Sequence, residues 1–261
     1  MLDRVFRVTH NIIYASGKKY CKPRQHTFFK IMLQLGSNPS LTHAKSNVDQ
    51  TLDLLAQNCG LEEASDLFSV ELASLLEEMK EDFETWDRNT PERFIFDMLV
   101  RRSQTAVVDY WEQILEIIAA CTAHEKDHEL RMDMMTLIEH LLLQENLQST
   151  IVFYSEIIVK LVLIPSTEWR VGLPTVKIRK AAVICLIKIM DLSLIEKPKL
   201  YESYKEIVTK MKSCLEDDWA NDLRFASIIL IKKLLAFLKN EMVGEDYTEI
   251  YPEMLKRLDD P

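Results

Sequence analysis

The stretch YKEIVTKMKSCLEDDWANDLRFASIILIKKLLAFL (204–238) contains the pattern that decides the fold of this chain. Apolar residues recur at spacings of three and four both before the turn LEDDWAN (215–221) and after it. This spacing places the apolar side chains along one face of an α-helix. The stretch therefore predicts two antiparallel helices, here called helix A and helix B, joined by a short acidic turn.

The beginning of helix A recurs along the chain. A tyrosine, any residue and a glutamate, followed by apolar positions at helical spacing, occur four times. The copies are YWEQILEI from Tyr110, YSEIIVKL from Tyr154, YKEIVTKM from Tyr204 and YTEIYPEM from Tyr247. The intervals of 44, 50 and 43 residues are close to constant, which indicates an internal repeat.

A second recurring position marks helix B. In each of the first three copies an apolar residue precedes an arginine, and a helix with a wide apolar stripe begins there. These arginines are Arg131, Arg179 and Arg224. Units of HEAT and armadillo repeats are about 40–47 residues long, whereas tetratricopeptide units have about 34. One helix pair cannot bury its apolar face alone, so neighbouring pairs are expected to stack on one another.

The composition favours the same fold. Only five glycines occur in 261 residues, although sheet proteins need glycine for their hairpin turns. We predict an all-α fold, a HEAT/armadillo-type α-solenoid of about five to six antiparallel helix pairs. Residues 106–261 are expected to hold HEAT repeats with units that start near 107, 149, 200 and 245. Residues 1–105 are expected to form degenerate helical repeats of the same continuous solenoid.

Breaks at glycine and proline divide the first hundred residues. They predict helices near 2–15, 24–35, 41–58, 62–86 and 91–102. Thr90 is predicted to be the N-cap of the last of these helices, with Pro91 at its first position. At the other end, the fourth copy of the repeat stops within the turn 258–261 and has no helix B. The chain is therefore expected to be a segment of a longer repeat protein.

The turns between helix A and helix B carry acidic residues in the clearest copies. They include Asp217 and Asp218, and Asp222 stands two residues before Arg224. A carboxylate there can accept hydrogen bonds from the first N–H groups of helix B and suits the helix dipole. It can also pair with the arginine of the neighbouring repeat, which would form a ladder along the stack. We expect these structural roles in preference to direct contact with a partner.

Charge excludes some classes of partner. The chain has a net charge of −9, and residues 62–92 hold eleven acidic residues against Lys80 and Arg88. A chain without a long basic stripe is a poor ligand for nucleic acid. The acidic stretch is expected to be the solvated face of a helix, and a basic partner is the alternative. The longest apolar runs, 157–164 and 226–238, are shorter than a bilayer span and contain lysines, so no membrane association is predicted.

Sequence motifs of catalysis and of cofactor binding are absent. The chain contains no G-x-S-x-G, no phosphate-binding glycine loop and no H-E-x-x-H, so we predict a protein without catalytic residues or cofactors. Cys121, His124 and His128 fall at helical spacing and could in principle hold zinc. They run through the charged turn AHEKDHELR (123–131), where helix A should end, so a solvated turn is the better interpretation. The five cysteines form no C-x-x-C pair, which is typical of reduced thiols in the cytosol or nucleus.

Trp169 and Trp219 both lie in turns between helix A and helix B of adjacent repeats. A tryptophan exposed on that edge of a stack would be a candidate for contact with a partner. The alternative is that each ring packs beneath its turn.

Four blocks of sequence resemble a known family. They are IVFYSEIIVKLVLIP (151–165), EWRVG (168–172), IRKAAVICL (178–186) and IYPEMLKRLDD (250–260). In order and spacing, over about 147–260, they are similar to the C-terminal HEAT repeats of the HEAT-repeat assembly factors of axonemal dynein. The resemblance implies a cytoplasmic scaffold for the preassembly of axonemal dynein arms. Its partners would be dynein intermediate or heavy chains and other assembly factors or chaperones, and no catalytic residue is implied. A TOG-like tubulin-binding array and a general adaptor or transport scaffold are the alternatives.

Overall fold

The computed structural model describes residues 2–38, 45–239 and 244–257. All regular secondary structure within these ranges is helical, which confirms the predicted all-α class. The chain divides into two compact units, Met1–Ile117 and Ile118–Pro261, and each is described by itself.

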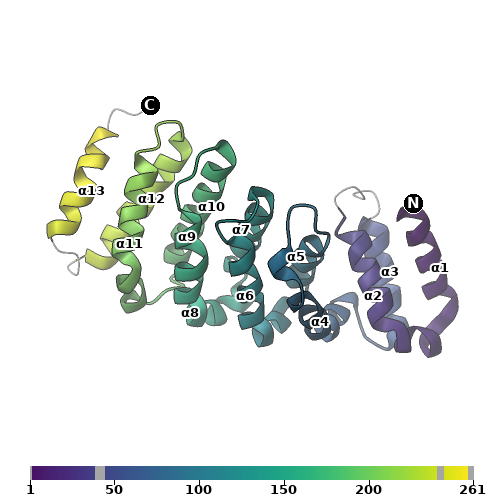
Figure 1. Cartoon of the computed structure of the whole chain (residues 1–261). Helices are drawn as coiled ribbons and strands as arrows, with labels where there is room; N and C mark the ends of the chain where they lie inside the picture. Colours follow the sequence, from purple (N-terminus) through teal and green to yellow (C-terminus); the bar gives the residue numbers. More distant parts are fainter. Residues whose placement is uncertain (1, 39–44, 240–243, 258–261) are drawn as a thin grey trace. The chain divides into compact units, whose positions relative to one another are not determined.

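Within its described residues, the first unit contains five α-helices, three short 3-10 helices and the beginning of a sixth α-helix. They are α1 (Leu2–Cys21), η1 (Lys22–Arg24), α2 (Gln25–Gly36), α3 (Lys45–Cys59), α4 (Ala64–Lys80), η3 (Phe83–Thr85), α5 (Glu92–Arg102), η4 (Gln104–Tyr110) and α6 (Trp111–Thr122). Helix α3 packs against α1, α2 and α4, and α5 packs against α2 and α4 (Figure 1). At the centre of this unit the rings of Phe29 and Phe68 meet edge to face, with centroids 4.9 Å apart.

The predicted helices of the first hundred residues are present, with three differences in their ends. The first continues to Cys21 across a kink at Gly17, whose positive φ of 58° is a conformation that glycine adopts without strain. The stretch predicted as one helix over 62–86 ends at Lys80 and continues as the short η3. The beginning of the helix expected at 41–58 lies partly outside the described residues, and α3 starts at Lys45.

The predicted N-cap at Thr90 was wrong. Helix α5 begins at Glu92, and Pro91 stands at its cap without a side-chain hydrogen bond. The hydroxyl of Thr90 accepts a hydrogen bond from the N–H of Asp87 at 3.0 Å and donates one to the carboxylate of Asp87 at 3.2 Å. The hydroxyl is therefore hydrogen-bonded within the turn 87–90 and does not cap α5.

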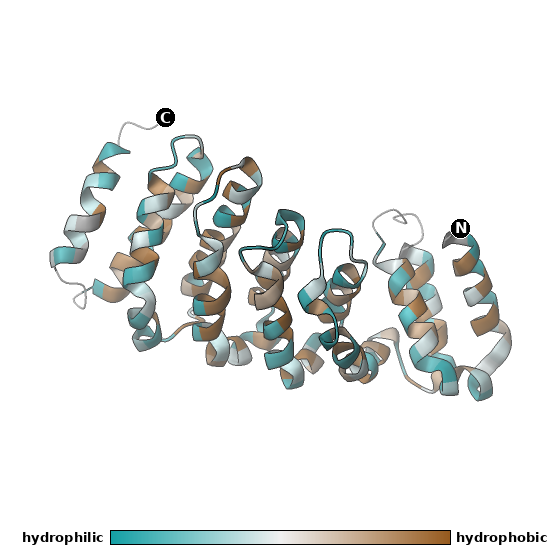
Figure 2. Cartoon of the chain, in the orientation of Figure 1, coloured by the Kyte–Doolittle hydropathy of each residue, from teal (hydrophilic) through white to brown (hydrophobic). Residues whose placement is uncertain are grey.

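The second unit forms two layers of helices. Its elements are α7 (His128–Leu142), η5 (Glu145–Leu147), α8 (Gln148–Ile157), η6 (Ile158–Leu163), α9 (Ile164–Ser166), α10 (Leu173–Asp191), α11 (Lys197–Leu215), α12 (Asn221–Leu238) and α13 (Gly244–Lys256). In one layer α10 packs between α7 and α12, and in the other α11 contacts α9 and α13 (Figure 1). Helices α11 and α12 pack against each other across the layers. Figure 2 shows hydrophobic residues in patches along these helices, whereas most connections between them are hydrophilic.

Residues 145–166 form one continuous helical stretch with a π-helical turn, η6, in its middle. Pro165 lacks an N–H group, and its ring would clash with the carbonyl group of Leu161, so the backbone widens before it. By length and composition this stretch could cross a membrane, and 44% of the window concerned is buried within the protein. The sequence interpretation considered only the run 157–164. It was wrong about the length, because the helical stretch begins at Glu145 and its residues 146–155 are uncharged. The core helix of a soluble protein meets the same criteria.

Candidate functional site

Three connections of the second unit lie at the same end of their helices and lead into α7, α10 and α12 (Figure 1). They are residues 123–127, 167–172 and 216–220. We call these connections, together with the first two turns of the helices that follow, the turn edge. Side-chain hydrogen bonds join neighbouring parts of the turn edge. Arg170 bonds to the ring of His124, and Nζ of Lys180 donates to the carboxylate of Asp222 at 2.6 Å.

The recurring arginines join α7, α10 and α12 to the chain that precedes each helix. Arg131 donates from Nε to the carbonyl oxygen of Thr122 at 3.0 Å, and Arg179 donates from Nε to that of Thr167 at 3.2 Å. Arg224 donates from Nη1 to the carbonyl oxygen of Asp217 at 2.9 Å. The last carbonyl groups of a helix have no partner within that helix. Arg131 and Arg179 donate to such carbonyl groups, since Thr122 ends α6 and Thr167 directly follows α9, whereas Arg224 bonds within the connection 216–220.

Arg179 also joins two neighbouring connections of the turn edge. Its side chain is fully buried, and Nη1 donates to Oδ2 of Asp217 at 2.9 Å while Nε holds Thr167. A further bond runs from Nη2 to the hydroxyl of Ser213 at 3.4 Å. One cation thus ties the connection 167–172 to the connection 216–220, because Arg179 of α10 bonds to both Thr167 and Asp217.

Asp218 and Asp222 do not form the ladder of aspartate–arginine pairs that the sequence suggested. Asp222 pairs with Lys180 and not with an arginine, and this hydrogen bond lowers the pKa of Asp222. Asp218 pairs with Arg257, which directly follows α13, at 2.8 Å. No side chain caps α12 among the residues that the structure describes, so none of the three carboxylates has the expected capping role. Asp127 has that role for α7, accepting the N–H groups of Glu129 and Leu130.

Both tryptophans of the turn edge lie at the surface. Trp219 is 97% exposed and Trp169 is 54% exposed, so neither ring packs beneath its turn. Val171, Leu173 and Phe225, at 83%, 69% and 66%, are exposed beside them. We call these five side chains the apolar edge cluster.

Sequence reasoning found only the two tryptophans of this cluster. A comparison of the columns could have found Phe225, because it directly follows the recurring arginine, where the other copies carry Met132 and Lys180. For Val171 and Leu173 no signal was available, because an aliphatic residue at the start of a helix is equally consistent with burial.

The residues considered for zinc are not gathered into a site. Cys121 is buried, and burial raises the pKa of its thiol to about 11, while the ring of His124 contacts Arg170. Within 2–38, 45–239 and 244–257, no three histidine, cysteine or acidic side chains are grouped so that they could hold a metal ion.

The acidic stretch 62–92 meets basic and polar residues of α2 inside the first unit. Glu71 of α4 is buried and accepts hydrogen bonds from Nε2 of Gln25 at 2.8 Å and from Nδ1 of His26 at 2.7 Å. Nε2 of the same histidine lies 2.7 Å from Glu78, which also pairs with Lys30. We call this group the α2–α4 clasp. Part of the acidic stretch is therefore compensated within the fold.

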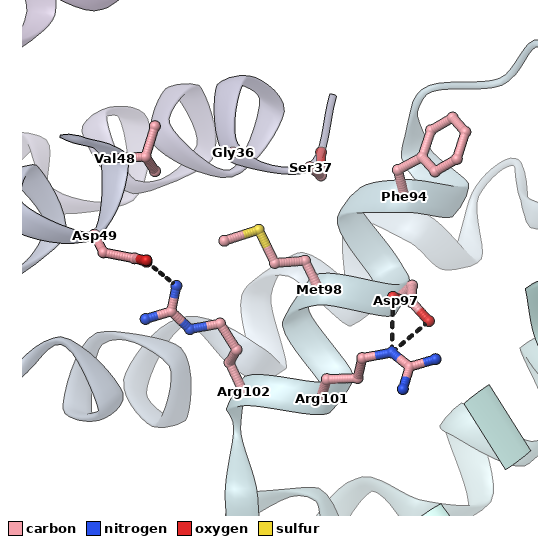
Figure 3. A pocket seen from close by; sticks show the side chains of 9 residues that line it. All are labelled: Gly36, Ser37, Val48, Asp49, Phe94, Asp97, Met98, Arg101 and Arg102. Carbon is pink, nitrogen blue, oxygen red and sulfur yellow. Dashed lines mark hydrogen bonds and ion pairs between the residues drawn. The ribbon is translucent and has the colours of Figure 1, made fainter. Parts of the chain in front are cut away.

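A cavity of about 410 Å³ lies between α2, α3 and α5 of the first unit (Figure 3). Two arginines line it, and each is bound to a carboxylate that also lines the cavity. Arg101 donates from Nε to Asp97 at 2.8 Å, and Arg102 pairs with Asp49 (Figure 3). These ion pairs offset the charge of the cavity.

Comparison with known proteins supports the resemblance. The chain is similar to dynein axonemal assembly factor 5 of Mus musculus, with 22% identity over 244 residues, and of Homo sapiens, with 25% identity over 234 residues. The protein of the same name from Xenopus laevis is 23% identical over 234 residues. These alignments cover 88–92% of this chain, so the similarity extends well beyond the blocks in 147–260.

The chain spans little more than a quarter of the length of these relatives, 27–28%. No family model matches it, and no solved structure does.

Proposed function

We propose that this chain is a non-catalytic HEAT-type scaffold that acts in the cytoplasm in the preassembly of axonemal dynein arms for motile cilia. The observation that carries this proposal is the similarity to dynein axonemal assembly factor 5 over 88–92% of the chain. Its partners would be dynein intermediate or heavy chains and other assembly factors or chaperones. Because the chain spans about a quarter of its relatives, the proposal assigns it a part of such a scaffold.

The packing of the second unit supports a HEAT-type stack. Helices α7, α10 and α12 lie in one layer, and each carries one of the buried Arg131, Arg179 and Arg224 within its first two turns. A stack in which successive helix pairs are held by similar contacts can be lengthened by further helix pairs. Stacks of this kind present long surfaces, which suit the binding of extended or incompletely assembled proteins.

The proposal is tested by affinity purification from ciliating cells with the tagged chain as bait. Axonemal dynein intermediate chains are expected to be enriched relative to a bait of similar size and negative charge made from an unrelated helical-repeat protein. Equal recovery on both baits, or recovery of no dynein subunit, would contradict the proposal.

A TOG-like tubulin-binding array is the second candidate, because exposed tryptophans lie on the turn edge. Against it, the same edge carries Asp217, Asp218 and Asp222, and the net charge of −9 is unsuited to the acidic outer surface of a microtubule. Co-sedimentation with microtubules and gel filtration with free tubulin separate the two candidates. A general adaptor would be recognised by co-purification of proteins unrelated to dynein.

A further inference from the structure

We propose that the outer face of α1 is the docking site for an acidic amphipathic helix of a partner protein. Val5, Val8, Ile12 and Ala15 form this face, with Arg4 beside them, and we call the four apolar residues the α1 seam. The inference goes beyond the proposed function, because it concerns a surface of the first unit and holds whether or not the partner is a dynein subunit.

The α1 seam is one continuous row because of its spacing along the helix. Its residues are three, four and three positions apart, which places them along one side of α1. Val5, Val8 and Ile12 are 41%, 57% and 37% exposed, and Ala15 is exposed as well. The helix is regular over the whole row, because its kink lies beyond it at Gly17. Alternating steps of three and four are those of the a and d positions of a coiled coil, so the row fits a second helix.

A different side of α1 holds the helix in the fold. Phe6 and Ile13 are buried, and α1 packs against α2 and α3 (Figure 1). His10 is hydrogen-bonded to the hydroxyl of Thr51 at 2.9 Å, and the amide of Asn58 donates to the carbonyl oxygen of Ile13 at 2.8 Å. The α1 seam is therefore presented by a helix that is already fixed, and a fixed surface loses less conformational entropy on binding.

The charges of α1 determine the sign of the partner. Residues 2–24, which form α1 and η1, contain six lysines and arginines against Asp3, and the next acidic residue of the chain is Asp49. Arg4 stands four residues before Val8 and so lies beside the row, and among the described side chains none pairs with it. A cation next to an a/d row is complementary to glutamates that flank the apolar row of a partner helix.

The elements packed against α1 do not reverse this sign. Helix α2 contains no acidic residue, and in α3 the acidic residues are Asp49 and Asp53. Each stands two residues from Thr51, whose side chain faces α1. Two residues correspond to about 200° of an α-helix, so both carboxylates lie on the far side of α3. Asp49 is in addition paired with Arg102.

The same features favour a protein helix over other anionic partners. A helix that lies in a membrane surface buries its wide apolar face in lipid. In α1 the side with Phe6 and Ile13 is packed inside the unit, and only a narrow row remains outside. Nucleic acid is bound through its phosphates, which make no use of an apolar row. An acidic amphipathic helix uses both the row and the cations.

The first experiment measures the binding of a synthetic peptide to the full chain by fluorescence anisotropy. The peptide has about three heptads, with leucine at positions a and d and glutamate at positions e and g. The control peptide has the same composition in a scrambled order, which removes the apolar row. We expect the amphipathic peptide to bind at least about tenfold more tightly than the scrambled one. Equal binding of the two peptides, or no binding of either, would overturn the inference.

The second experiment locates the site with two pairs of variants of the full chain. Val8→Asp places a carboxylate in the α1 seam, and its control is Val70→Asp on α4, because Val70 is 56% exposed and Val8 is 57% exposed. Arg4→Glu reverses the charge beside the row, and its control is Lys232→Glu on the exposed surface of α12. The two members of each pair change the net charge equally, so general repulsion of an acidic peptide is the same in both.

We expect Val8→Asp and Arg4→Glu each to weaken binding of the amphipathic peptide at least about fivefold, and each control to weaken it less than about twofold. All four positions are at the surface, so the variants should fold, and circular dichroism checks this. Equal losses in a variant and its control would overturn the inference.

A last comparison tests the class of the partner. The native chain is mixed with phosphatidylserine vesicles or with duplex DNA at roughly 150 mM salt. We expect no flotation with the vesicles and no mobility shift of the DNA. Binding to either that Arg4→Glu abolishes would overturn the inference, because it would assign the cations of this face to lipid or to nucleic acid.

Discussion

The α2–α4 clasp of the first unit and the apolar edge cluster of the second unit each contain residues that the sequence marked as candidates for contact with a partner. The two groups differ in whether the fold itself satisfies these residues. In the clasp, carboxylates that could have met a basic partner are bound by His26 and Lys30 of the same unit. In the cluster, Trp169 and Trp219 remain at the surface, above a buried arginine that fixes their backbone. A run of charge is therefore partly satisfied within the fold, whereas exposed aromatic rings remain available for a partner.

The largest expected effect concerns the arginine beneath the cluster. Arg179→Met removes a fully buried cation and leaves Asp217 and the carbonyl oxygen of Thr167 without their donor. Breaking a buried pair by removing one partner costs about 3–5 kcal/mol, and we expect this loss in the free energy of unfolding. Urea denaturation followed by circular dichroism measures it.

The matched control is Lys188→Met on the same helix. Lys188 pairs with Glu139 of α7 at 2.8 Å, and both side chains are partly exposed. Partly exposed pairs contribute about 0–1 kcal/mol, so this variant should remain close to the native chain. Equal losses in the two variants would show that the buried arginine has no special part in holding the turn edge.

The next effect concerns the buried carboxylate of the clasp. Glu71→Ala leaves Gln25 and His26 without their shared acceptor in a buried place. Loss of a partner for buried polar groups costs about 1–3 kcal/mol. Glu77→Ala, on the same helix but 64% exposed, is the control and should change the free energy of unfolding by less than about 1 kcal/mol. If the two substitutions are equivalent, α2 and α4 are held by apolar packing alone.

A smaller effect is the pH dependence of the clasp. Burial alone would lower the pKa of His26, but its hydrogen bonds with Glu71 and Glu78 outweigh burial and raise that pKa. A group with a raised pKa in the folded state stabilises the fold fully below its unfolded value. That stabilisation is lost as pH rises through the folded value. Since His26 is 36% exposed and therefore screened by solvent, we expect less than about 1 kcal/mol.

The measurement compares the free energy of unfolding at about pH 5.5 and pH 8. The native chain should lose more stability over this range than His26→Asn, which cannot become charged. The titration of Glu78 does not change the direction of this predicted loss of stability. Burial opposes the effect, but hydrogen bonds from Lys30 and His26 lower its pKa, so its own contribution is lost only at acid pH. If the free energy of unfolding changes equally with pH in the native chain and in the variant, His26 does not contribute to the pH dependence.

The sequence was sufficient for the features that depend on local spacing. Apolar residues at spacings of three and four predicted the helices, and the three arginines that the repeat singled out, Arg131, Arg179 and Arg224, are buried. The clasp could not be predicted, because it joins residues 45 to 52 positions apart, and period alone does not say which helices become neighbours. Thr90 was misjudged because its hydroxyl had two possible partners, the N–H groups of α5 and Asp87, and only tertiary geometry chooses between them.

The smallest expected effect on stability, and the sharpest contrast with Arg179→Met, concerns Trp219→Ala. A ring that is 97% exposed gives almost no buried contact to the fold, so the free energy of unfolding should change by no more than about 0.5 kcal/mol. Trp111→Ala is the control, since that ring is 1% exposed and its loss should cost about 3–5 kcal/mol. If Trp219→Ala destabilises the chain by more than about 1 kcal/mol, the ring supports the turn itself. A ring that stabilises the turn in this way would be a poor candidate for contact with a binding partner.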